Sequence, residues 1–302
     1  MRITVLAGGL GGSRCVHALA GAAGAANVTA IGNVGDDLEM WGLHVSPDLD
    51  TIMYTLAGLL DEERGWGVRG DTYEAMAVAE QAGNETWFTL GDQDAGLHML
   101  RTRLLGKGEP LSTVTRKLAE GLGVGIRLIP ATDDRLRTKI RTPDGELDFQ
   151  EWFVQRRHAD RVDGVRFEGA GEARPAPGAL EAIAEADLVV IAPSNPFVSI
   201  QPILAVPGIE AALREKRVAA VSPLVGGKAI RGPLAEMMAS LGHEPGALGV
   251  RALYGDLVSV FVLDREDEAL AGEISGAVVC DTVMVFPERR TDVGREILEA
   301  IG

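Results

Sequence analysis

The chain has 302 residues, of which 46% are hydrophobic and 24% are charged, a balance typical of a globular protein with one large domain or two modest ones. Its formal net charge of -15 argues against nonspecific nucleic-acid binding, because phosphates are attracted to a basic surface. An acidic protein can still bind an anionic small molecule when a divalent cation and backbone N–H groups mediate the contact. No nucleic-acid partner is therefore expected, and small anionic ligands stay open.

Cysteine content and apolar runs predict a soluble, cytoplasmic protein. The two cysteines, Cys15 and Cys280, lie in apolar runs and are expected to be buried free thiols. The first residues, MRITVLAGG, enter a strand directly, and their apolar run is too short for a signal peptide. No apolar run approaches the ~20 residues of a membrane-spanning helix, so no membrane partner is expected.

Short apolar runs that end in glycine or proline turns and lead into helical patterns recur along the chain, which predicts an α/β fold with a mostly parallel sheet. Apolar residues on both faces of each run indicate strands covered by helices on either side. The predicted strands are 3–7, 28–31, 188–192, 218–221, 257–263 and 277–286. The predicted helices are 13–23, 51–60, 202–214, 233–241 and 292–301.

The middle of the chain has a different pattern. Residues 72–122 are mainly helical in pattern, and 139–149 indicate a hairpin that turns at Pro143-Asp144-Gly145. We therefore predict a single α/β domain over 1–302. Within it, a smaller helical and hairpin lobe at about 72–160 covers the carboxyl edge of the sheet, where an active site is expected.

A glycine-rich segment, Gly8-Gly9-Leu10-Gly11-Gly12-Ser13, follows the first strand. Glycines let the backbone approach a phosphate closely, and the helix that follows offers free N–H donors. Arg14 stands where a dinucleotide fingerprint needs glycine or alanine, and no Walker lysine follows. The segment predicts a nucleotide or diphosphate cradle of neither type; a turn needed only for packing is the alternative. The residues predicted to bind are Gly8, Gly9, Gly11, Gly12 and Ser13.

Four aspartates follow the second strand, Asp36 and Asp37 at once and Asp48 and Asp50 soon after. We expect both segments to be loops at the carboxyl edge of the sheet, where four carboxylates repel one another unless a cation joins them. Mg²⁺ suits this arrangement, since it takes a few carboxylates and bridges substrate phosphates. Asp37 and Asp50 are the preferred ligands; capping of the helix that starts near Thr51 is the alternative role for Asp48 or Asp50.

A polar segment near the middle of the chain follows the aromatic pair Trp87-Phe88. Carboxylates two residues apart beside aromatic rings can hold a planar polar heterocycle. A helix cap is the alternative for Asp92, and a structural role is the alternative for His98. The candidates are Gly91, Asp92, Asp94 and His98.

Two strands in the second half end in polar turns. Ser194 and Asn195 stand between two prolines, which fix a rigid turn that presents their side chains. The next strand ends at Ser222, and Lys228 follows two glycines. A lysine there can reach a phosphate as a point charge, although a solvated surface lysine is an equal alternative.

Taken together, these segments resemble the 2-phospho-L-lactate transferase family. The matching motifs occur in the family's order between about residues 3 and 234, and nine in order form a specific signal. They are AGGLGG, NVGDD, SPDLDT, GWGVRGDT, WFTLGDQD with His98, PATDD, DFQEWFV, IAPSNPFVSI and VSPLVGGKAIRGP.

The resemblance implies a Rossmann-like, three-layer fold, often dimeric, and a Mg²⁺-dependent transfer in the biosynthesis of coenzyme F-420. The donor is a guanosine diphosphate ester of lactate or a related three-carbon acid. The ribityl hydroxyl of the deazaflavin Fo attacks the donor's β-phosphorus, and GMP leaves. Whether the three-carbon group is phospholactate, phosphoenolpyruvate or phosphoglycerate stays open.

Carried over residue by residue, the resemblance places Gly8 to Gly12 on the diphosphate, and Ser194, Asn195 and Pro196 at the guanosine end. Asp50 and Thr89 match positions that contact Fo, although relatives often carry a basic residue at position 89. Asp37 and Asp50 match the acidic pair near the metal. We therefore expect Asp50→Asn to abolish transfer and leave the fold intact. A nucleotide-sugar-binding regulator of related fold is the rival function.

Overall fold

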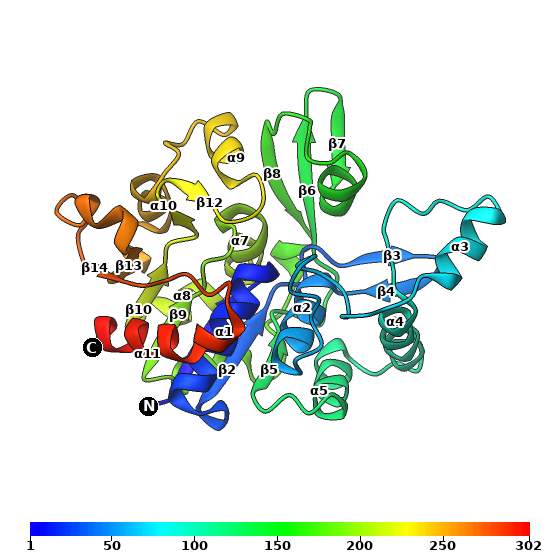
Figure 1. Cartoon of the computed structure of the whole chain (residues 1–302), viewed down its shortest axis with the longest axis horizontal. Helices are drawn as coiled ribbons and strands as arrows, with labels where there is room; N and C mark the ends of the chain where they lie inside the picture. Colours follow the sequence, from blue (N-terminus) through cyan, green and yellow to red (C-terminus); the bar gives the residue numbers. More distant parts are fainter.

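The computed structural model describes all 302 residues. Seven parallel strands form its central sheet: β1 (Ile3–Ala7), β2 (Val28–Gly32), β5 (Arg127–Pro130), β9 (Leu188–Ile191), β10 (Val218–Val221), β13 (Val260–Asp264) and β14 (Ala277–Cys280). Their spatial order is β14-β13-β10-β9-β1-β2-β5 (Figure 1), and β1 pairs with Val28 of β2 and Leu188 of β9 opposite its Ile3. The predicted α/β class with a parallel sheet is confirmed.

Helices cover both faces of the sheet. On one face α1 (Gly9–Ala23) packs against α2 (Pro47–Leu56) and α11 (Arg290–Ile301). On the other, α6 (Ala179–Glu185) packs against α8 (Ile209–Arg214). The chain runs from β1 toward one edge of the sheet and from β9 toward the other, so right-handed crossovers place these two helix groups on opposite faces. One continuous hydrophobic core contains residues from almost the whole chain, the first being Ile3 and the last Ile301.

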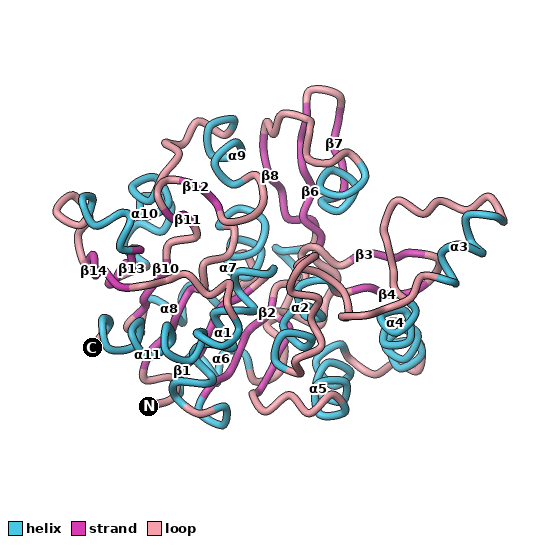
Figure 2. The backbone as a smooth tube through the Cα atoms, in the orientation of Figure 1, coloured by secondary structure: helices cyan, strands magenta, loops and turns pink.

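Smaller elements complete the fold around the central sheet (Figures 1 and 2). They include three short antiparallel sheets and further helices. The sheets are β3 (Leu38–Met40) with β4 (Leu43–Val45), β6 (Arg137–Thr142) between β7 (Gly145–Asp148) and β8 (Gly164–Glu168), and β11 (Leu224–Val225) with β12 (Lys228–Ala229). The helices are α3 (Glu74–Gln81), α4 (Asp92–Leu105), α5 (Leu111–Gly121), α7 (Gln201–Leu204), α9 (Leu234–Ser240) and α10 (Ala247–Tyr254). None of the helices has the length and apolar content that crossing a bilayer requires.

Two helix starts differ from the sequence-based prediction, and both differences bear on the site. Helix α1 begins at Gly9 instead of residue 13, so most of the glycine segment is its first turn and not a loop. Helix α2 begins at Pro47 instead of residue 51, because proline is well suited to a first helical turn. Asp48 and Asp50 therefore lie inside a helix, and the prediction that they occupy a loop was wrong.

Other predictions fail where the chain turns. The single helix expected at 202–214 is α7 and α8, separated by Pro207 and by Gly208, which has a φ of 93°. The strand expected at 277–286 ends at Cys280. Strand β5 was not predicted, and it pairs with β2 in the central sheet from within the 72–160 span. The hairpin at 139–149 is confirmed as β6 and β7. Both cysteines are buried and free, as predicted.

Candidate active site

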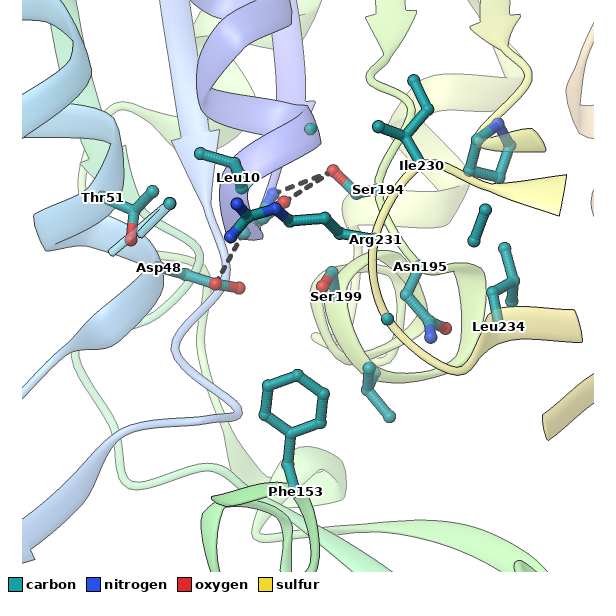
Figure 3. Close-up of a pocket in the computed structure, with 18 of the residues that line it drawn as sticks. Leu10, Asp48, Thr51, Phe153, Ser194, Asn195, Ser199, Ile230, Arg231 and Leu234 are labelled. Atoms are coloured by element: carbon teal, nitrogen blue, oxygen red, sulfur yellow. Dashed lines mark hydrogen bonds between the residues drawn. The ribbon is translucent and has the colours of Figure 1, made fainter. Parts of the chain in front are cut away.

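A cavity of about 510 Å³ opens at the carboxyl ends of β1 and β9. These two strands are neighbours in the sheet but lead the chain in opposite directions, which is the switch point where α/β folds bind ligands. Figure 3 shows Asp48 and Ser194 on the two sides of the start of α1, with Phe153 facing them and Arg231 extending across the opening.

The glycine turn at the cavity floor is packed closely by its neighbours. A Cβ atom on Gly8 would overlap the Asp48 carboxylate, and one on Gly11 would overlap the Pro193 carbonyl oxygen. The Ser194 hydroxyl donates to the Gly8 carbonyl at 2.8 Å and accepts from the Gly8 N–H at 3.2 Å. The glycines are thus required both for packing and for exposing backbone to the cavity.

The predicted glycine-segment residues divide between cavity and core. Gly8, Gly9 and Gly11 line the cavity. Ser13 is fully buried behind them, where its hydroxyl donates to the Leu10 carbonyl at 2.9 Å. Gly12 is also buried and outside the lining.

Asp36 and Asp48 are the two aspartates of the acidic cluster that line the cavity. The Gly9 N–H donates to Asp48 Oδ1 at 2.5 Å, and Asn33 Nδ2 donates to Asp48 Oδ2 at 2.9 Å. Gln150 Nε2 donates to Asp36 Oδ2 at 3.3 Å. The bond from Gly9 fixes the Asp48 carboxylate beside the glycine turn, and the bond from Gln150 fixes the Asp36 carboxylate in the cavity wall.

Asp37 lies next to this pair but outside the cavity lining. Its Oδ2 accepts a hydrogen bond from the Ser46 hydroxyl at 3.1 Å and lies 2.9 Å from His44 Nε2. Asp37 Oδ1 and Asp36 Oδ1 are buried and have no hydrogen-bond donor. Unsatisfied buried carboxylate oxygens indicate that a charge partner belongs here.

The acidic group fits a hard divalent cation. Burial raises the pKa of Asp36 well above its usual range, and the charges of Asp48 and Asp37 raise it further. Burial likewise raises the pKa of Asp48 to about 6, against hydrogen bonds from Asn33 and Gly9 that lower it. No group of three or more His, Cys, Asp or Glu side chains is placed to hold a metal ion without other ligands. A pair of carboxylates completed by substrate phosphates is the usual arrangement for Mg²⁺.

Asp50 points away from the cavity. Successive helical residues are 100° apart, so Asp48 and Asp50 project from nearly opposite sides of α2. Asp50 is 3% exposed and forms an ion pair with Arg101, whose Nη1 donates to Asp50 Oδ2 at 3.0 Å. Although burial alone lowers the pKa of Arg101, the Asp50 carboxylate raises it.

His98 and Asp94 belong to the same buried network, between α2 and α4. His98 Nδ1 lies 3.0 Å from Arg101 Nη1, and His98 Nε2 lies 3.0 Å from Asp94 Oδ1. The Tyr54 hydroxyl donates to Asp94 Oδ1 at 2.5 Å. Burial raises the pKa of Asp94, but the bonds from His98 and Tyr54 outweigh it and lower the pKa overall. Neither His98 nor Asp94 lines the cavity.

Asp92 caps a helix, although not the one that it begins. Its carboxylate accepts hydrogen bonds from the backbone N–H groups of Glu74 and Ala75, both at 3.1 Å, at the start of α3. Asp71 in turn accepts from Gln93 N–H at 2.9 Å at the start of α4. Gly91 permits this approach, because a Cβ there would overlap Asp71. Of the residues predicted to contact Fo, Thr89 is the one that lines the cavity.

The polar turns of the second half divide in the same way. Ser194, Asn195 and Ser222 line the cavity. Asn195 Oδ1 also accepts from the Phe197 N–H at 2.9 Å, which fixes the turn. Pro196 is buried outside the lining, and Lys228 is exposed on β12, also outside it.

Several cavity residues were not among the predicted site residues. The segment after β7 contributes an aromatic wall, in which Phe149 and Phe153 stack with ring centroids 5.3 Å apart. Arg231 donates to the carbonyl oxygens of Glu63, at 2.8 Å, and Arg64, joining two loops across the opening. The motifs DFQEWFV and KAIRGP contain these residues, but nothing in their spacing shows that they meet.

The family comparison and the similar named proteins point to one family. Residues 3–295 match the family described as 2-phospho-L-lactate transferase CofD. A protein of Streptomyces griseus named phosphoenolpyruvate transferase is 44% identical over 97% of this chain and 94% of its own. A protein of Methanospirillum hungatei named 2-phospho-L-lactate transferase is 36% identical over 98% of this chain and 99% of its own.

Among solved structures, a protein of the UPF0052 family from Bacillus halodurans aligns with a TM-score of 0.61. It is 16% identical, and the alignment covers 98% of both chains. At that identity the likeness supports the fold alone.

Proposed function

Because the chain belongs to the 2-phospho-L-lactate transferase family, we propose that it carries out its transfer reaction in the cavity at the β1–β9 switch point. The transferred group is a phosphoryl group that carries a three-carbon acid. The chain is an enzyme of coenzyme F-420 biosynthesis, and it moves a phospholactyl or enolpyruvyl group from a GDP-linked donor to Fo. One observation supports this placement above the others: a single cavity joins a helix N-terminus, two carboxylates and an aromatic wall.

We propose that the donor carries phosphoenolpyruvate. Four relatives from Streptomyces and Kitasatospora are named phosphoenolpyruvate transferase and are 42–45% identical to this chain. Two relatives named 2-phospho-L-lactate transferase are 36% and 37% identical. Similarity over nearly the whole chain therefore favours an enolpyruvyl donor.

The purified enzyme is expected to use guanylated phosphoenolpyruvate with a kcat/KM at least about tenfold higher than guanylated phospholactate, a difference within the reach of one small pocket contact. Mass spectrometry of the phosphorylated Fo product and chromatography of GMP measure both reactions. Mixtures without Fo are the control for donor hydrolysis. Equal or higher kcat/KM with the phospholactyl donor would contradict the assignment, and no GMP release with any guanylated donor would contradict the reaction itself.

In the proposed reaction the ribityl hydroxyl of Fo attacks the donor's β-phosphorus. The new oxygen–phosphorus bond forms as the anhydride bond to GMP breaks, and the hydroxyl proton is lost. Backbone N–H groups at the start of α1 hold the diphosphate, and the Gly8–Ser194 contacts keep that turn rigid. Asn195 and Ser222 face the nucleoside end of the donor.

We propose that Asp36 and Asp48 hold Mg²⁺, with Asp37 beside them. When bound, the ion would neutralise charge that develops as GMP departs. The hydrogen bonds from Gly9 and Asn33 fix the Asp48 carboxylate next to the diphosphate site. The sequence favours Asp37 and Asp50 as metal ligands and Asp50 as the catalytic residue. Both roles stay predictions, and neither side chain lines the cavity.

The deazaflavin ring is proposed to lie near Thr89 and the stacked pair Phe149 and Phe153. All three line the cavity, and aromatic side chains suit a planar heterocycle. Gly91, Asp92, Asp94 and His98 are proposed to support this end indirectly, because their contacts fix α3 and α4.

We propose that the protein is a cytoplasmic homodimer, because its sequence resembles a family whose members are often dimeric. Size-exclusion chromatography with light scattering is expected to give about twice the monomer mass of 31.9 kDa. A monomer mass at all concentrations used for turnover would contradict it.

A further inference from the structure

Arg14 stands in the sequence where a dinucleotide-binding turn requires glycine or alanine. In the structure it lies on the first turns of α1, is 5% exposed and lines the cavity. Its Nη2 donates to Glu62 Oε2 at 2.8 Å, while its Nε–H has no acceptor. The protein alone therefore does not satisfy this buried guanidinium.

The charges around Arg14 do not balance. Glu62 also pairs with Arg290, whose Nη2 lies 2.6 Å from Glu62 Oε1, so one carboxylate serves two guanidinium groups. Arg290 is 1% exposed, and Glu288, the other carboxylate that acts on it, is exposed. Burial and the Arg290 charge lower the pKa of His17, and a histidine supplies no negative charge in either protonation state. One positive charge is left over, and a buried unpaired charge is costly.

The excess charge lies beside the cavity. Arg290 Nε donates to the Met284 carbonyl at 2.8 Å, and Met284 and Val285 are part of the cavity wall. The start of this 15-residue helix adds its own partial positive charge. The Gly9 N–H already donates to Asp48, but Leu10 and Gly11 also line the cavity there. Two independent features thus favour a negative group in this part of the cavity.

We propose that Arg14 and the N-terminus of α1 form an anion subsite for an oxygen of the donor's phosphate or carboxylate. This rests on the proposed function, because it places the donor in this cavity. The subsite complements Asp36 and Asp48: their carboxylates favour a cation, whereas Arg14 favours an anion. Glu62 is a positioning residue that holds Arg14, and Arg290 holds Glu62.

The charge count separates this subsite from a purely structural role. Replacing Arg14 by methionine keeps most of the side-chain volume and leaves Glu62 and Arg290 as a balanced pair. The ligand-free Arg14→Met variant is therefore expected to melt at or above the wild-type temperature. A residue kept only for the fold would lower the melting temperature when removed.

The test is isothermal titration calorimetry with GDP and with a guanylated three-carbon donor, in Mg²⁺ and without Fo. Arg14→Met is expected to weaken binding of the donor by roughly 10- to 100-fold, the worth of a charge-assisted hydrogen bond. Arg14→Lys is expected to recover part of that loss. Arg2→Met is the matched control, because Arg2 forms an exposed ion pair with Glu185 at the opposite edge of the sheet.

The titrations distinguish a phosphate oxygen of the donor from an oxygen of its carboxylate. Equal weakening of GDP and donor identifies a phosphate oxygen, whereas weakening of the donor alone identifies the carboxylate. Unchanged affinity for both ligands in folded Arg14→Met would overturn the subsite. Binding is measured apart from turnover, so a wild-type enzyme that binds GDP but never modifies Fo would refute the proposed function and leave the Arg14 result interpretable.

Discussion

Replacing Asp48 by asparagine is expected to lower kcat/KM for transfer to Fo by at least about 100-fold, equivalent to about 3 kcal/mol of lost charge stabilisation. Asp48 faces the cavity, and its two oxygens accept from Gly9 and Asn33. An asparagine can accept at only one of these positions and carries no charge for a cation. Initial rates of GMP release at donor and Fo concentrations below their KM values measure the loss, and a Mg²⁺ titration should shift to higher concentration.

The fold of the Asp48→Asn variant is expected to persist, because removing one charge relieves repulsion with Asp36 and Asp37. Glu39→Gln is the matched control: Glu39 is an exposed acid on the neighbouring strand β3 and should leave turnover unchanged. Turnover by Asp48→Asn within a few-fold of wild type, at wild-type Mg²⁺ demand, would rule out Asp48 as a ligand.

Replacing Asp50 by asparagine is expected to destabilise the protein by about 3–5 kcal/mol, the usual cost of breaking a buried ion pair. Asp50 is 3% exposed and Arg101 0% exposed, so the substitution leaves a buried guanidinium without its carboxylate. From the sequence alone we expect an intact fold; the ion pair changes that expectation. Urea denaturation followed by circular dichroism measures the difference.

The double variant Asp50→Asn with Arg101→Met separates stability from catalysis. Removing both charges is expected to restore most of the lost stability, since neither partner is left unpaired. Transfer to Fo by this stable double variant then tests the role of Asp50 itself. Lost transfer supports the Fo contact implied by the family resemblance, whereas wild-type transfer would contradict it. An Asp50→Asn variant that is as stable as the wild-type protein would contradict the ion-pair argument.

Parts of the fold that depend on local sequence were predicted well. Strands such as Ile3–Ala7 and Val218–Val221 match because each is a short, wholly apolar run bounded by turn residues. Strand β5 was missed although it is buried from Leu128 onward, because its four residues begin with an exposed arginine and end in proline. Only pairing with β2 makes that segment a strand.

The same limit applies to the site. The order of motifs was sufficient to predict the family, the reaction and the glycine turn, since each motif is local. The aromatic wall was missed because Phe153 reaches the cavity from a segment more than a hundred residues along the chain from the glycine turn. Its place in the cavity wall depends on how the small sheet of β6, β7 and β8 stands over the central sheet (Figure 1).

By itself, the sequence of this protein determined the α/β class, the glycine turn after the first strand and the chemistry of a transferase, because apolar patterns and motifs act over a few residues. Tertiary structure alone decided which acid faces the cavity. Asp48 and Asp50 are equivalent in the sequence, but α2 starts at Pro47 and sends them to opposite sides. One side is the cavity, and the other is covered by Arg101 from α4.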